Sequence, residues 1–116
     1  MVDTGRTIQH RLLALARDAH AGGLHEAAYH ALAGALHAAE AARDLATVTA
    51  VMREAATQLA WIDRHLPEHR MSSSSAASHG TPSGYEMLLR QARSWTAAAS
   101  MRSGSEATQP GSPGGN

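Results

Sequence analysis

Cysteine, phenylalanine and lysine are all missing from this chain of 116 residues. The absence of cysteine excludes a disulfide framework and a cysteine nucleophile. No apolar run is long enough to span a membrane, and the N-terminal segment lacks the features of a secretory signal, so we expect a cytoplasmic protein. Basic and acidic residues balance at 10 each, which argues against nucleic acid or a membrane surface as the partner.

Sequence motifs that support catalysis are also missing. The chain contains no G-x-S-x-G or H-E-x-x-H motif and no glycine-rich phosphate loop after a strand. Its Glu and His side chains gather on an outward helix face, where no pocket would perturb their pKa values for acid-base work. We therefore predict that this protein is not an enzyme.

The apolar residues that are present are spaced as in packed helices. Between residues 45 and 66 they alternate steps of three and four, which is the seam of a bundle helix. Asp44 suits the N-cap of this helix, and Pro67 ends it. The members of this seam are Leu45, Val48, Met52, Ala55, Leu59, Ile62 and Leu66. A shorter seam of the same kind is predicted at Ile8, Leu12, Leu15 and Ala19.

Residues 12–40 combine two helical segments into a hairpin, with Gly22 and Gly23 at the turn. Small and large apolar residues alternate on its predicted inner faces, at Leu12, Leu15, Ala16 and Ala19 and then at Ala28, Leu32, Ala35 and Leu36. This spacing resembles a single, degenerate tetratricopeptide repeat. The resemblance implies an antiparallel pair of close-packed helices, a pattern that any alanine-rich helix pair also shares. Leu12, Ala19 and Glu40 stand where the family commonly has tryptophan, tyrosine and proline, and no second repeat follows.

Composition divides the chain into four segments. Residues 1–66 form a helical body, 67–84 a linker rich in Ser, Gly and Pro, 85–102 an amphipathic helix, and 103–116 a disordered tail. The predicted fold class is all-α, a three-helix body with a tetratricopeptide-like antiparallel hairpin and a fourth amphipathic helix after a flexible linker. This fourth helix docks on its own chain, swaps onto a second copy or binds another protein.

The predicted core is thin and rich in alanine, which favours association. A body of roughly sixty residues buries only ~60% of the surface that its unfolded chain exposes. We predict a non-catalytic protein-interaction or assembly module without a cofactor, which binds a protein partner or itself, with a homodimer as the expected state. Trp61 points away from the seam of its helix and lies beside Arg64, a combination enriched at binding hot spots. The predicted contact residues are Trp61, Arg64, Tyr85, Leu88 and Trp95.

A second hypothesis is a metal-binding helical bundle. The four residues Glu26, His30, His37 and Glu40 share one stripe of the second helix, because their spacing keeps them within about one third of its circumference. Imidazole and carboxylate ligands suit a transition metal ion such as Zn, Fe or Mn. The stripe lies opposite the apolar face, so a metal would need further ligands from another helix or another copy of the chain.

Histidines at the end of the third helix offer such ligands. His65 and His69 are one turn apart, and Asp63 and Glu68 lie beside them, although Pro67 interrupts the helix between the two histidines. A third hypothesis needs no metal, because clustered imidazoles titrate near neutrality and repel one another when protonated. On that hypothesis the protein assembles in a pH-dependent manner.

Overall fold

The computed structural model describes residues 4–107, and side chains between residues 6 and 102. Within this range the all-α prediction is confirmed, since the chain forms helices and no strand. The helices are α1 (Thr4–Ala21), α2 (His25–Ala41), α3 (Leu45–His65), α4 (Ser73–Ser78) and α5 (Gly84–Ala107). The last helix therefore runs past residue 102, where the tail was predicted to begin, and the rest of the predicted tail, 108–116, lies outside the described residues.

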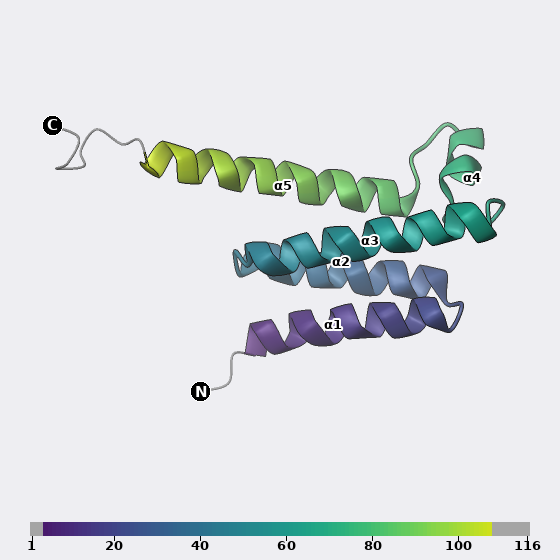
Figure 1. Ribbon diagram of the computed structural model, residues 1–116, viewed down its shortest axis with the longest axis horizontal. Coiled ribbons are helices and arrows are strands. Elements are labelled where there is room, and N and C mark those ends of the chain that lie inside the picture. The colour runs from purple at the N-terminus through teal and green to yellow at the C-terminus, as the bar shows by residue number, and fades with distance from the viewer. Residues whose placement is uncertain (1–3, 108–116) are drawn as a thin grey trace, which may run out of the picture.

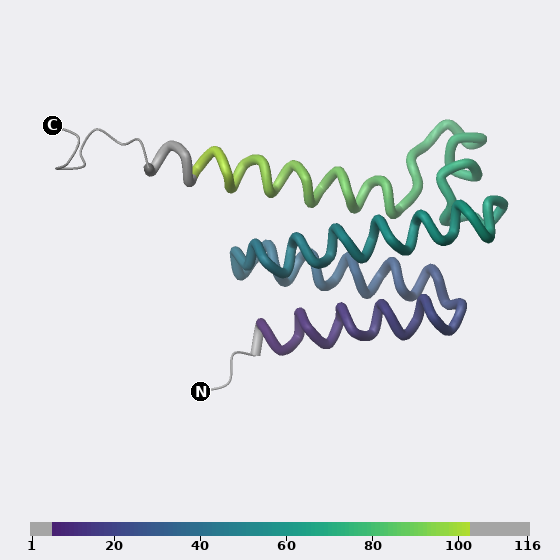
Figure 2. Tube along the Cα trace, viewed as in Figure 1, coloured from purple at the N-terminus to yellow at the C-terminus, as the bar shows by residue number. Residues whose placement is uncertain are grey.

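The long helices run antiparallel to their neighbours in the chain (Figure 1). α1 and α2 form the predicted hairpin, and Gly23 adopts a φ of 81° in its turn, a conformation that costs glycine little. α3 packs on α2 and α1, and α5 packs on α3 and α2. Up to residue 102, α5 runs past the start of α3 (Figure 2).

Both ends of α3 follow the predicted signals. The Asp44 carboxylate accepts hydrogen bonds from the Thr47 amide at 3.1 Å and from the Thr47 hydroxyl at 2.7 Å, which makes it the N-cap. These hydrogen bonds lower the pKa of Asp44, because they favour the ionised carboxylate. The helix ends at His65, two residues before Pro67.

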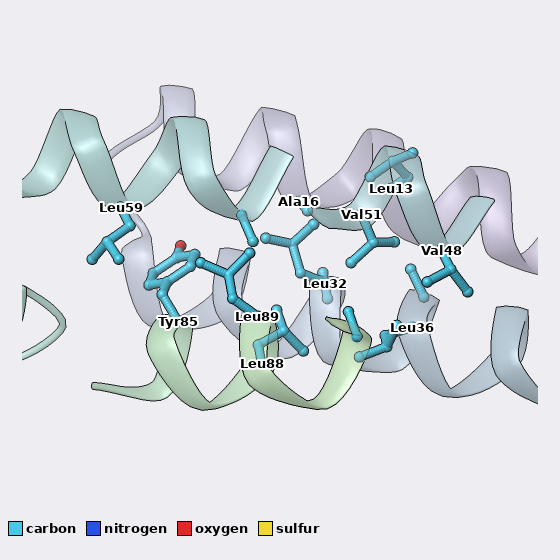
Figure 3. Close-up of a cluster of buried hydrophobic side chains, with 14 of the residues drawn as sticks. Leu13, Ala16, Leu32, Leu36, Val48, Val51, Leu59, Tyr85, Leu88 and Leu89 are labelled. Carbon is cyan, nitrogen blue, oxygen red and sulfur yellow. The ribbon is translucent and has the colours of Figure 1, made fainter. Parts of the chain in front are cut away.

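The core lies between α2, α3 and α5, and α1 closes one side of it (Figure 3). The inner face predicted for α2 is confirmed, since Ala28, Leu32, Ala35 and Leu36 are fully buried. The seam predicted for α3 is buried at Val48, Ala55, Leu59 and Ile62. Leu45 and Leu66 remain exposed, because they lie at and just beyond the two ends of the helix.

The seam predicted for α1 is rotated relative to the observed one. Ile8 and Leu15 are 44% and 56% exposed, and the buried residues are Gln9, Leu13 and Ala16. The side-chain amide of Gln9 donates to a backbone carbonyl of α2 at 3.4 Å, so a polar residue occupies an interior position with its donor satisfied. The prediction for α1 is therefore confirmed at Ala16 and at Leu12, which packs on the core, and it is wrong at Ile8 and Leu15.

A buried polar network connects the four long helices. Tyr85 of α5 donates its hydroxyl to the Gln58 carbonyl on α3 at 2.7 Å, and the hydroxyl also lies 3.3 Å from the His25 backbone carbonyl of α2. The Gln58 amide donates in turn to the Ala16 carbonyl of α1 at 3.3 Å. Burial raises the pKa of Tyr85, so the phenol stays protonated and remains a donor. This network fixes the position of α5 on its own chain.

The segment predicted as a linker contains α4 and is attached to the body. The Asp63 carboxylate on α3 accepts from the Ser73 amide at 2.7 Å and from the Ser73 hydroxyl at 2.8 Å. The buried Ser72 hydroxyl donates to the Pro67 carbonyl at 2.6 Å and caps α4 by accepting from the Ser75 amide at 3.0 Å. These hydrogen bonds hold the start of the segment against the end of α3.

Candidate functional site: a histidine–tryptophan cluster

Five nitrogen-containing rings meet at one end of the bundle, where the turn between α1 and α2 lies against the end of α3. We call this set the histidine–tryptophan cluster; its members are His20, His25, Trp61, His65 and His69. The hairpin turn supplies two rings, α3 supplies two, and the segment after Pro67 supplies the last. Residues far apart in the sequence are therefore gathered at one site.

Trp61 is the centre of this cluster. The centroid of its indole lies 5.2 Å from that of His20 and 5.5 Å from that of His25. The His65 ring, one helical turn further along α3, lies 4.6 Å from it. The indole is nevertheless 42% exposed, so the histidines border it without covering it.

The imidazoles of His20 and His25 contact each other directly. Their Nδ1 atoms are 3.1 Å apart, which requires a proton on one Nδ1 and a lone pair on the other. Burial lowers the pKa of both rings, and the neighbouring His20 and His69 lower the pKa of His25 further. The Glu54 carboxylate acts in the opposite direction on His20. Both imidazoles are thus favoured in their neutral form.

His69 is held in a single tautomer when it is neutral. Its Nδ1 accepts a hydrogen bond from the Met71 amide at 3.0 Å, so the proton of the neutral ring resides on Nε2. The ring packs edge-on against His25, with 5.3 Å between the centroids. This contact links the segment after α3 to the hairpin turn.

A shallow surface pocket lies beside the indole on α3. It is lined by Thr57, Ala60, Trp61, Arg64 and His65, and we call these residues the Trp61 face. Thr57 and Ala60 are small, which leaves the depression next to the larger aromatic and arginine side chains. The surface can accommodate an apolar or aromatic side chain beside a guanidinium group.

The structure divides the predicted contact residues between two locations. Trp61 and Arg64 are exposed together on α3, as the sequence predicted. Tyr85 and Leu88 are buried in the core at 0% and 6% exposure, so the structure removes them from the predicted contact surface. Trp95 is half-buried and packs against the same core from α5.

The Glu/His stripe of α2 is not brought together as a ligand set. Glu26 forms an ion pair with Arg70, and the Glu40 carboxylate lies 4.0 Å from His37 Nδ1 and accepts a hydrogen bond from a glutamine of α5 at 3.4 Å. His30 is exposed beside a tyrosine ring. Between residues 4 and 107, no group of three or more His, Asp or Glu side chains is arranged to hold a metal ion.

Sequence reasoning singled out Trp61, His65 and His69 but overlooked His20 and His25. The signal for the pair is a histidine on each side of Gly22 and Gly23, five residues apart. Helical periodicity says nothing about such a pair, because the turn interrupts the helix between them.

Comparisons with protein-family models, with curated proteins and with solved structures found no match to this chain. The resemblance of residues 12–40 to a tetratricopeptide repeat therefore stays a prediction. In the part of the chain that the structure describes, no helix combines the length and apolar character needed to cross a bilayer. The fold and this site define an all-α helical protein whose most distinctive surface is the histidine–tryptophan cluster.

Proposed function

We propose that this protein is a non-catalytic interaction module that forms a homodimer through the Trp61 face. The observation that carries this proposal is the 42% exposure of Trp61, a large aromatic side chain that lies beside Arg64 and a shallow pocket. Tryptophan and arginine are the residue types most enriched at binding hot spots. When a partner removes an exposed indole from water, the free energy of the complex is lowered.

A two-fold arrangement fits the shape of this surface. In a symmetric dimer the same patch on both copies must be self-complementary, so each indole has to find a place on the opposite copy. The depression at Thr57 and Ala60 offers that place. The formal net charge of the chain is +0 when histidine is neutral, so two copies meet without overall repulsion. We further propose that the protein acts in the cytoplasm, in keeping with its cysteine-free sequence.

Light scattering on a size-exclusion column, in a buffer that contains a chelator, tests this proposal. The wild-type protein is expected to elute with twice the 12.2 kDa mass of the chain and to shift toward the monomer on dilution. Trp61→Ala is expected to weaken the dimer by at least about 30-fold, which corresponds to the roughly 2 kcal/mol lost at a hot spot. Circular dichroism of the variant should show unchanged helix content, because Trp61 is not part of the core.

Leu15→Ser is the matched control. Leu15 is more exposed than Trp61, at 56%, and it lies on α1. Its replacement removes an exposed apolar side chain and should leave the mass unchanged. A wild-type protein that is monomeric at every concentration would refute the proposal, and so would a dimer that dissociates in the Leu15 variant and persists in the Trp61 variant.

A further inference from the structure

The Nδ1 atoms of His20 and His25 are close enough for both to bond to one metal ion. Their Nδ1 atoms are 3.1 Å apart, and the two rings are inclined at 65° with their centroids separated by 4.9 Å. Zinc–imidazole bonds are about 2.0–2.1 Å long, so an ion bonded to both nitrogens would subtend an N–metal–N angle of roughly 98°. This angle lies between the values for square-planar and tetrahedral coordination.

We propose that His20 and His25 together bind one divalent transition metal ion through their Nδ1 atoms, with water in the remaining positions. Imidazole ligands suit Cu²⁺, Ni²⁺ and Zn²⁺, and affinity for a given set of ligands is generally greatest for Cu²⁺. The proposed site has two protein ligands, and it is separate from the Glu/His stripe of α2.

The hairpin turn holds the backbone of both histidines in place, so the two imidazoles are close together before an ion arrives. His20 lies in the last turn of α1 and His25 is the first residue of α2. The turn between them is fixed by hydrogen bonds from the Gly22 amide to the Asp18 carbonyl at 3.0 Å and from the Leu24 amide to the Ala19 carbonyl at 2.8 Å. The His25 backbone carbonyl also lies 3.3 Å from the Tyr85 hydroxyl. Little conformational entropy is therefore lost when the two rings bind one ion.

The protonation states of the two rings also suit metal binding. Burial lowers the pKa of both imidazoles, so lone pairs rather than protons are favoured near neutral pH. In the metal-free pair one Nδ1 carries the shared proton. Binding moves that proton to Nε2 of the same ring through solvent, so the neutral pair takes up an ion without net proton release. The Glu54 carboxylate, which acts electrostatically on His20, partly offsets the added positive charge.

Trp61 provides a local reporter for this site. Its ring centroid lies 5.2 Å and 5.5 Å from those of the two histidines, so Cu²⁺ or Ni²⁺ bound there would quench its fluorescence. Trp61 and Trp95 are the 2 tryptophans of the chain, so Trp95→Phe leaves Trp61 as the sole fluorophore of that type. Titration of this chelator-treated variant with copper chloride or nickel chloride should give saturable quenching at one equivalent, reversed by a chelator.

His20→Gln tests the assignment, because His20 is only partly buried and its replacement leaves the helices intact by circular dichroism. This change is expected to weaken the quenching transition by roughly tenfold or more. His37→Gln on the exposed stripe is the matched control and should leave the titration unchanged. Copper electron paramagnetic resonance should show coupling to two imidazole nitrogens, and to fewer in the His20 variant.

Two results would overturn the site. The first is quenching that survives His20→Gln with unchanged affinity. The second is quenching that disappears in His65→Gln, which would transfer the ion to His65 and His69 at the end of α3. Neither result bears on the dimer, because the mass measurement on Trp61 variants is made in the presence of a chelator.

Discussion

Tyr85→Phe should reveal how much the buried polar network contributes to stability. The substitution keeps the ring, which is fully buried, and removes the hydroxyl that donates to the Gln58 carbonyl at 2.7 Å. Gln58 is itself fully buried, so its carbonyl oxygen would lose this donor in a site that water does not reach. An unsatisfied buried acceptor costs about 1–3 kcal/mol, and we expect the free energy of unfolding to fall by about 2 kcal/mol.

Urea denaturation followed by circular dichroism measures this loss directly. For a domain of this size about 2 kcal/mol corresponds to a decrease in Tm of roughly 10 °C. Tyr29→Phe is the matched control, because it removes the same hydroxyl from a partly buried ring that packs on Tyr85 with 5.7 Å between centroids. We expect that control to change stability by less than about 0.5 kcal/mol.

A double variant separates the hydrogen bond from other effects of the substitution. When Gln58→Leu is added to Tyr85→Phe, both polar partners are replaced by apolar groups, and the double variant should recover part of the stability that Tyr85→Phe loses. A loss below about 0.5 kcal/mol for Tyr85→Phe alone would refute the reasoning. It would mean that the Gln58 carbonyl has another donor or lies closer to water than the observed burial implies.

The structure also predicts the effect of two further substitutions and of a change in pH. Gly34→Ala should raise the free energy of unfolding by about 0.5–1 kcal/mol in a urea titration, because alanine is the better helix former and its Cβ would meet a leucine of α1 at an ordinary 3.4 Å. Gly84→Ala should lower it by about 1 kcal/mol or more in the same assay, because its Cβ would lie 3.0 Å from the Tyr29 ring. In chelator-containing buffer, stability should fall as the pH drops below about 6.5, since the lowered pKa values of His20 and His25 mean that the unfolded chain binds protons first. The last prediction is checked by thermal denaturation at a series of pH values, and a Tm that stays constant or rises on acidification would contradict it.

Local signals in the sequence predicted the helices well. The three-four spacing located α3, and Asp44 and Pro67 marked its two ends, because caps and stops act within one turn of the chain. The same spacing identified the buried face of α2, where Leu32 and Leu36 lie in the core. Such patterns are visible in the sequence because they depend on neighbours three and four residues apart.

The face of α1 that is buried could not be predicted from this spacing alone. Ile8 and Leu15 belong to the predicted seam and are exposed, whereas Leu13, which lies outside it, faces the core. The buried line of a helix is set by the directions from which its neighbours approach, and α1 packs on both α2 and α3. The buried Gln9 donates its side-chain amide to a carbonyl of α2 at 3.4 Å, a contact that the spacing along α1 does not reveal.

The candidate site depends partly on spacing along one helix and partly on packing between helices. Trp61 and His65 share one side of α3, and their spacing of four residues was enough to place them together. His20 and His25 reached them only when the hairpin turn packed against the end of α3. The burial of Tyr85 was equally a tertiary result, since its amphipathic helix was compatible with docking on this chain or on another.

The sequence by itself determined an all-α chain, the course of its long helices and the absence of cysteine chemistry, because propensity, capping and composition are local properties. Only the tertiary structure decided which face of α1 is buried, where α5 docks and which histidines surround Trp61. These outcomes depend on contacts between residues distant in the chain, and the free energy of such contacts is fixed by the shape and polarity of the partner that each helix meets.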